Sequence, residues 1–311
     1  MADAQKNLKL WYNGRDITEK VDILECVVRD VSGTESDGLN LLCEHAEQWL
    51  KWGVEKNDIV RVTRGGYDSK DLYINSIAPE NGTFRIYATG IKCAPFEPEW
   101  KSWENTTLGK IMNECAAEGG MKYSLFGISK DTPYEYLLRD GLRAPAFLEK
   151  LLRMEGCVLK SLNGSFTGIG ISYAQGLACA HVMKVEPDMK DTEYVLRQDQ
   201  MWSSVTINSA FGKGQAIDSR GMGRAKTFTC IPAGSNVEAK RWARGILLNH
   251  NRQNEMLKVN MDFDPGYTAM ARIDVESKTP AEGHWLVDWV EHDLMLGKTR
   301  AKLVRCLTGV I

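Results

Sequence analysis

The chain has 311 residues and a mass of 34.9 kDa, with 43% hydrophobic and 26% charged residues, a composition typical of a globular chain of about two domains. Its 39 basic and 41 acidic residues give a formal net charge of −2, which excludes a chain that is basic throughout, as binding along a phosphate backbone would require. We expect a cytoplasmic protein outside the membrane, because there is no run of about 18 apolar residues and no apolar segment typical of a secretory signal.

The first 93 residues are predicted to be mainly strands. Residues 8–12 alternate and then reach Asn13-Gly14, a dipeptide typical of β-hairpins. Residues 37–52 fit either one apolar face of a helix, with His45, Trp49 and Trp52 on it, or a strand followed by a turn. We expect a small all-β unit, either a barrel or a sandwich. Further strands are predicted over 22–31, 58–63, 71–79 and 82–91, with Asn81-Gly82 as the breaker before the last of them.

Pro95 and Pro98 mark a boundary, after which the period changes from that of strands to that of helices. Thr107 is a suitable N-cap for a helix whose apolar residues recur over 108–116, and Gly119-Gly120 would end it.

A second helix is predicted to start at Pro145 and to run to Gly156. Two strands should follow, joined by the turn Asn163-Gly164. Residues 100–172 therefore read as an α+β insert between β regions.

The last part of the chain is predicted to return to strands. Residues 211–226 are rich in glycine and charge, which favours a long exposed loop, ordered by a partner if at all. Ser235 and Glu238 form a capping box before a helix that should fray near 249–251. Strands over 256–311 follow. Three of them, over 268–275, 284–290 and 299–307, faintly repeat the pattern of 58–63, 71–77 and 83–91.

The glycine motifs do not match a nucleotide site. Gly297-Lys298-Thr299 has the end of a P-loop, but His292 stands where the first glycine is required. Gly212-x-Gly214 and Gly221-x-Gly223 lack the strand and helix of a dinucleotide fingerprint.

Histidines and carboxylates offer weak alternatives. His284 and His292 could face each other, but a polar group at the end of a sheet explains each of them equally well. Two pairs of acids, Asp262 with Asp264 and Glu291 with Asp293, are candidates for the two carboxylates of a glycosidase. Such pairs arise by chance in a chain with 41 acids, so we interpret them as part of a solvated face. A distant Cys–His pair also stays open. We predict no enzyme, no catalytic, metal or cofactor site, and no identified interface residue.

The tryptophans and cysteines are expected to have structural roles. The pairs Trp49/Trp52, Trp100/Trp103 and Trp285/Trp289 are predicted to lie in a core or a subunit interface. No two cysteines lie within four positions, so the close pair usual in structural zinc sites is missing, and we expect small buried hydrophobic residues in a reducing compartment. The cysteines are Cys26, Cys43, Cys93, Cys115, Cys157, Cys179, Cys230 and Cys306.

Several segments, in this order and spacing, make the chain resemble a phage tail baseplate hub protein of the late control protein D family. That family is similar to the central hub of T-even phages and to the N-terminal half of type VI secretion spikes. Three departures are Asn57 where glycine is usual, Ala144 where we expect a polar N-cap, and residues 211–226, which have no counterpart. The matching segments are 12–18, 37–41, Trp49 to Asp58, 106–123, 134–160, 241–247 and 283–294.

The resemblance implies an α+β, mainly β fold with two tube-like β-barrel domains and an α+β insert between them. The domains would be residues 1–95, 96–172 and 173–311, with the helix near 235–250 in the last one. A threefold assembly of two barrels per chain would give a pseudo-sixfold ring. The faint internal repeat is consistent with such a ring.

The function implied by the resemblance is a structural hub in a phage or phage-like contractile tail, assembled in the bacterial cytoplasm. The homotrimer would join the sixfold tail tube protein to the threefold spike protein, with tape measure and baseplate wedge proteins as further candidate partners. It would contact no membrane and bind no specific nucleic acid. A tail-associated cell-wall hydrolase and a receptor- or carbohydrate-binding tip module are the alternatives.

Overall fold

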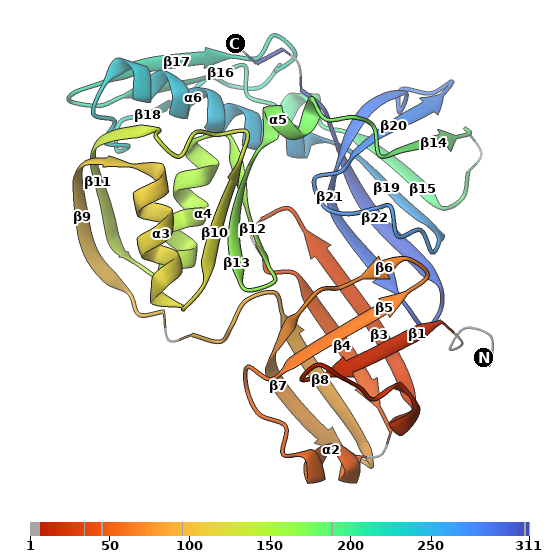
Figure 1. The fold of residues 1–311 in the computed structure, drawn as a ribbon. Helices are drawn as coiled ribbons and strands as arrows, with labels where there is room; N and C mark the ends of the chain where they lie inside the picture. The colour runs from red at the N-terminus through yellow and green to blue at the C-terminus, as the bar shows by residue number, and fades with distance from the viewer. Residues whose placement is uncertain are drawn as a thin grey trace.

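The computed structural model describes residues 7–33, 35–44, 46–94, 96–187, 189–307 and 309–310, and shows an α+β fold made mainly of strands (Figure 1). The predicted fold class is therefore confirmed. His45 and Pro95, which entered the predictions, lie outside the described residues. None of the helices that the structure describes combines the length and apolar character needed to span a membrane.

The elements of the first part are β1 (Leu8–Tyr12), β2 (Arg15–Asp16), β3 (Ile23–Val31), β4 (Gly38–Cys43), α2 (Ala46–Trp52), β5 (Ile59–Arg64), β6 (Tyr67–Asp68), β7 (Leu72–Glu80) and β8 (Thr83–Thr89). The middle part holds β9 (Glu99–Thr107), α3 (Leu108–Glu118), β10 (Lys122–Phe126), β11 (Pro133–Leu142), α4 (Ala144–Met154), β12 (Cys157–Leu162), β13 (Ser165–Gly170) and α5 (Ile171–Gln175). The last part holds β14 (His181–Val185), β15 (Thr192–Leu196), β16 (Ser204–Asn208), β17 (Lys213–Ile217), β18 (Lys226–Phe228), α6 (Asn236–Asn251), β19 (Glu255–Asp262), β20 (Arg272–Ser277), β21 (Gly283–Asp293) and β22 (Lys298–Arg305).

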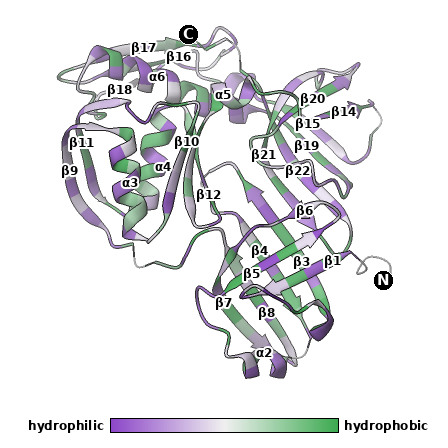
Figure 2. Cartoon of the chain, in the orientation of Figure 1, coloured by the Kyte–Doolittle hydropathy of each residue, from purple (hydrophilic) through white to green (hydrophobic). Residues whose placement is uncertain are grey.

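One large sheet of 14 strands joins the first and last parts of the chain. We call β1, β3, β4, β5, β7 and β8 the first half-sheet, and β14, β15, β19, β20, β21 and β22 the second. The two meet where β3 pairs antiparallel with β21. Hydrophobic and hydrophilic residues alternate along strands such as β5 and β8 (Figure 2), because one face of each strand turns toward a core and the other toward solvent.

The two half-sheets repeat the same strand order. In chain order, β3, β4, β5, β7 and β8 correspond to β15, β19, β20, β21 and β22. In space they run β3-β4-β8-β7-β5 and β15-β19-β22-β21-β20, and every neighbouring pair in both sets is antiparallel. The sixth strands differ, because β1 lies antiparallel to β5 whereas β14 lies parallel to β20. The faint sequence repeat thus corresponds to a repeated topology.

Matching β-bulges fix the alignment of the two half-sheets residue by residue. The register between β7 and β8 shifts at Asn75, between Ile74 and Ser76, and that between β21 and β22 shifts at Asp288. A bulge adds one residue to one strand, so Asn75 and Asp288 occupy equivalent positions. The row of facing residues just before each bulge is Val28, Leu39, Ala88 and Ile74 in the first half-sheet and Tyr194, Leu257, Leu303 and Val287 in the second.

Three hydrophobic cores support this arrangement. One lies on the first half-sheet around Trp49 and Phe84, and another lies on the second around Trp285. The third is built on α3, α4 and the small sheets beside them, and it also takes in Trp242 of α6. The helix predicted near 235–250, which we grouped with the second barrel, therefore has buried side chains in the core of the insert.

Most of the local signals are confirmed. The Thr107 side chain accepts a hydrogen bond from the Lys110 N–H (3.4 Å) at the start of α3. Ser235 caps α6 by accepting from the Glu238 N–H (3.3 Å), while the Glu238 carboxylate accepts from Gly234 and not from Ser235. The predicted turns at Asn13-Gly14, Asn81-Gly82 and Asn163-Gly164 each join two antiparallel strands.

Two local predictions need correction, and one ambiguity is resolved. Residues 211–226 are not one exposed loop, because β17 pairs with β16 and packs on α6. The glycines there allow close approach: a Cβ at Gly214 would collide with the main chain of Lys240. The second helix begins at Ala144, with Arg143 as its N-cap, one residue earlier than predicted. Residues 37–52 form both alternatives in succession, β4 and then α2.

Candidate functional site

The joint between the two half-sheets is the candidate functional site. The Ser32 N–H donates to the Asp288 carbonyl and the Leu294 N–H donates to the Cys26 carbonyl, each at 2.8 Å. These bonds bracket the pairing of β3 with β21 and make the two half-sheets continuous. The side chains buried along the joint include Val28, Val31, Val290 and His292.

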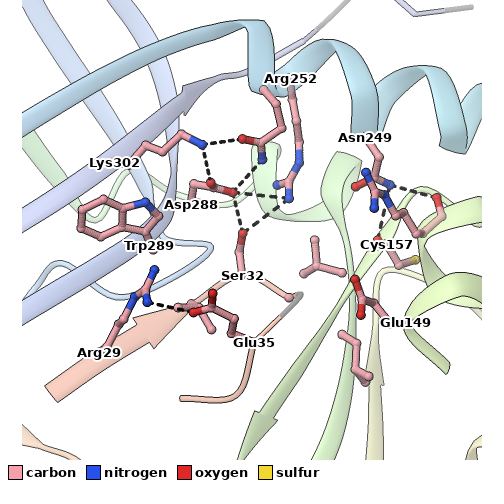
Figure 3. A pocket seen from close by; sticks show the side chains of 16 residues that line it. Arg29, Ser32, Glu35, Glu149, Cys157, Asn249, Arg252, Asp288, Trp289 and Lys302 are labelled. Carbon is pink, nitrogen blue, oxygen red and sulfur yellow. Dashed lines mark hydrogen bonds and ion pairs between the residues drawn. The ribbon is translucent and has the colours of Figure 1, made fainter. Parts of the chain in front are cut away.

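Asp288, at the bulge of β21, collects polar contacts from three segments (Figure 3). Its Oδ1 accepts from Ser32 Oγ (2.8 Å) and Gln253 Nε2 (3.0 Å), and its Oδ2 accepts from Lys302 Nζ (3.0 Å). Arg252 Nη2 lies 3.5 Å from Oδ1. Burial alone would raise the pKa of Asp288, but the charges of Arg252 and Lys302 outweigh it and hold the pKa below its usual value. Asp288 is therefore ionised at the joint.

Arg252 is the buried cation of this network. Arg252 is 4% exposed, and the loss of solvation lowers the pKa of its guanidinium group. Among the described residues, its Nε and Nη1 have no hydrogen-bond partner. Arg252 lines a cavity of about 310 Å³ that also borders Glu149 of α4 and Trp289 of β21 (Figure 3). The charge of Arg252 thus depends on Asp288, its ion-pair partner.

A second buried network ties the joint to the insert. Lys160 of β12 donates to Asp30 and to both oxygens of Asp37 (2.9 and 2.7 Å). Asp37 also accepts from the Val31 N–H (3.0 Å), and Asp30 accepts from the Ala269 N–H (3.0 Å). Two carboxylates share one ammonium group here, so charge fixes the strand β12 of the insert to the first half-sheet. Asp30 in turn is hydrogen-bonded to the segment that precedes β20.

Burial makes the ionisation of Asp37 a source of pH-dependent stability. Burial and the neighbouring Asp30 raise its pKa to about 7, against the attraction of Lys160. A raised pKa stabilises the fold below the pKa of the unfolded chain, and the stability is lost as the pH rises through 7. Between pH 5 and pH 8 we therefore expect the free energy of unfolding of the wild type to fall by about 1–3 kcal/mol more than that of Asp37→Asn. Urea denaturation of both proteins at the two pH values measures this; parallel pH dependence would contradict it.

The carboxylate pairs singled out in the sequence lie at turns and in surface ion pairs. Asp262 pairs with Lys298 (2.8 Å) and its side chain is 93% exposed, while Asp264 accepts from the Gly266 N–H (2.9 Å). Glu291 pairs with Arg300 (3.4 Å). Asp293 accepts from the N–H groups of Met295 and Leu296 in the turn after β21. These contacts agree with the interpretation as a solvated face and turn residues.

The two histidines are not brought together. His284 contacts Asp274 (2.7 Å) on the strand beside it. His292, eight residues further along the same strand, is buried between Thr299 Oγ1 and the Tyr267 carbonyl, each at 3.0 Å. Within the described part of the chain, no three His, Cys, Asp or Glu side chains are grouped as metal ligands.

Tryptophans and cysteines largely follow the expectation of burial. Trp49, Trp103 and Trp285 are buried, whereas Trp100 is 75% exposed. Burial raises the pKa of the Cys43, Cys115, Cys157 and Cys306 thiols to about 12, so these stay protonated and unreactive. Contrary to the prediction, Cys230 is exposed, and Cys93, Cys179 and Cys306 are only partly buried.

The residues that make the joint were not singled out from the sequence. Lys160 carried a usable signal, because it is the one charged residue in the otherwise neutral strand 157–162. Asp288 carried the same kind of signal, because it is an acid between apolar residues of the strand 285–290. Arg252 stands among polar residues and carried none, and the contacts of both cross between segments far apart in the chain.

Comparisons with known proteins are consistent with the fold described above. No model of a known protein family matches the sequence, and no curated protein matches it either. Solved structures do match. The 43 kDa tail protein of prophage MuSo2 from Shewanella oneidensis superposes with a TM-score of 0.72 at 14% identity, over 96% of this chain and 98% of that one.

Two further structures have the same fold. The tail protein of Neisseria meningitidis MC58 gives a TM-score of 0.72 at 11% identity, over 96% of each chain. A type VI secretion component from E. coli, described as similar to the T4 bacteriophage tail proteins gp27 and gp5, gives 0.57 at 11% identity over 95% of this chain and 76% of that one. The chain therefore has the fold of phage tail proteins, which confirms at the level of fold the resemblance inferred from its sequence.

Proposed function

We propose that the chain is the structural hub of a phage or phage-like contractile tail, in the manner of the late control protein D family. It acts as a homotrimeric adaptor between a sixfold tail tube and a threefold spike. It performs no bond chemistry and works by matching the symmetry of its neighbours.

The observation that carries this proposal is the repeated strand order of the two half-sheets, joined edge to edge through β3 and β21. A chain with two equivalent sheets presents two equivalent surfaces to a sixfold partner. Three copies then present six such surfaces while the assembly as a whole keeps threefold symmetry. One chain thus meets both symmetries without needing two proteins.

The parts of the chain have distinct roles in this proposal. Residues 1–95 and 173–311 supply the two tube domains, and residues 96–172 supply an insert, against which α6 also packs. The tail tube protein and the spike protein are the direct partners, and tape measure and baseplate wedge proteins are further ones. The particle is assembled in the bacterial cytoplasm. The structure adds no observation that favours the hydrolase or the receptor-binding alternative.

The proposal is tested with the purified full-length chain, the tail tube protein and the spike protein of the same particle. Electron microscopy of the mixture should show the chain at one end of the tube with the spike attached to it. Binding to neither partner would contradict the proposal. Release of cell-wall fragments by the chain alone would favour the hydrolase instead.

A further inference from the structure

The internal joint has an unfilled counterpart in the same chain. In the alignment of the two half-sheets, β3 corresponds to β15, and residues 289–293 of β21 correspond to residues 76–80 of β7. Two of these four segments, β3 and residues 289–293, pair with each other at the internal joint. The other two, β15 and residues 76–80, pair with no strand on the equivalent edge within the described part of the chain.

The pairings of the described residues establish both open edges. β15 pairs with β19 on one side, and no pairing on its other side is found among the described residues. β7 pairs with β5 only through Leu72 and Tyr73, so residues 76–80 have β8 as their sole neighbour in the part of the chain that the structure describes. Figure 1 shows β7 and β15 far apart in the large sheet, so the two edges cannot meet within one chain.

Residues at the open edge are more exposed than the equivalent residues at the internal joint, as expected where a neighbouring strand is missing. Val290 and His292 are buried where β21 pairs with β3. The equivalent Ile77 is 39% exposed, and the equivalent Pro79 is also exposed. Leu196, at the end of β15, is 45% exposed. Large apolar side chains on unpaired strand edges are a liability for an isolated protein. Ile77 and Leu196 both project from the face of the sheet that is buried elsewhere.

We propose that β15 of one copy pairs antiparallel with residues 76–80 of β7 in a second copy, in the register of the internal joint. This rests on the proposed trimer and names the strands that close it. At the internal joint Val31 faces Trp289, Arg29 faces Glu291 and Val27 faces Asp293. The equivalent pairs between copies are Arg197 with Ser76, Val195 with Ala78, and Glu193 with Glu80, and Leu196 then lies opposite Ile77.

The contact is head-to-tail, so it must close into a ring to leave no free edge. Three copies contain three internal joints and three joints between copies, which is the pseudo-sixfold arrangement. The joint between copies is the weaker kind. Pro79 has no N–H to donate, and Glu80 faces Glu193, whose charge is offset by Lys258 at 2.9 Å. A proline on an edge strand also discourages pairing with unrelated strands.

A disulfide placed across the proposed joint tests the register. Asp288 and Leu294 make main-chain bonds to β3, so Glu291 lies at a non-hydrogen-bonded position, and Ala78 is its equivalent. Facing Cα atoms at such positions are about 4.5 Å apart, within the range that a disulfide spans. The variant Ala78→Cys/Val195→Cys, in a Cys230→Ser background, should therefore form covalent trimers under mild oxidation.

The matched control is Ala78→Cys/Glu193→Cys, which moves one cysteine two residues along the same face. Diagonal neighbours lie about 7–8 Å apart, beyond the usual disulfide range, so this variant should stay largely uncross-linked on a non-reducing gel. Native mass under reducing conditions is measured for both variants. A trimer without selective cross-linking would overturn this pairing and leave the proposed function standing. A monomer at every concentration would overturn both.

A second pair of variants tests the apolar contact. Leu196→Lys should shift the trimer toward monomer at least tenfold in dissociation constant, because it places a charge against Ile77. Leu296→Lys, at an exposed site in the turn between β21 and β22, should leave the dissociation constant unchanged. Equal effects of the two substitutions would contradict the proposed position of Leu196.

Discussion

Replacing Asp288 with alanine is expected to lower the free energy of unfolding by about 3–5 kcal/mol. The substitution leaves the Arg252 charge buried without its ion-pair partner, and it also removes acceptors from Ser32, Gln253 and Lys302. Breaking one side of a buried ion pair costs far more than the pair contributes, because the remaining charge has neither solvent nor partner. Urea denaturation followed by tryptophan fluorescence measures the loss.

The control is Glu291→Ala, three residues along the same strand. Glu291 pairs with Arg300 at 3.4 Å, and the Arg300 side chain is 62% exposed, so we expect a change below about 1 kcal/mol. Asp288→Asn keeps the shape and one acceptor but removes the charge, and should fall between the two. Equal effects of Asp288→Ala and Glu291→Ala would show that the buried network does not hold the half-sheets together.

The second large effect is expected at Gly245, in the middle of α6. Glycine to alanine inside a helix ordinarily stabilises it by about 1 kcal/mol. Here a Cβ would collide with the main chain of Met154 and Gly156 at the end of α4, which cannot move as a flexible side chain could. We expect Gly245→Ala to destabilise the protein by about 2–3 kcal/mol through overpacking.

Val237→Ala is the matched control on the same helix, because Val237 is 75% exposed. It should change stability by less than about 0.5 kcal/mol. Stabilisation by Gly245→Ala would mean that α4 and α6 are not in close main-chain contact. Thermal unfolding of both variants and the wild type distinguishes these outcomes.

The signals that depend on neighbours in sequence were readable before the structure. Period and capping located α3 through Thr107, and the Asn-Gly dipeptides located three hairpin turns, since each depends on a few adjacent residues. The faint repeat of three strands was also visible. Its extension to five strands was not, because strand order is a property of pairings between distant segments.

The ion pair at the joint could not be predicted from the sequence for a related reason. Arg252 follows a helix among other polar residues, and Asp288 is an acid between apolar residues of a strand. Neither sequence context shows that the fold buries the two charges against each other. The glycines at 212 and 214 suggested a loose loop, whereas their missing side chains allow β17 to approach α6 closely. Glycine signals either freedom or close approach, and only the packing decides between them.

The native mass of the purified chain in solution, measured by light scattering, tests the central claim most directly. Three copies of the 34.9 kDa chain give about 105 kDa, the closed ring in which two half-sheets per chain satisfy every edge. A stable hexamer would contradict the account, because twelve half-sheets do not fit a sixfold ring. A chain that stays monomeric over the whole accessible concentration range would contradict it as well.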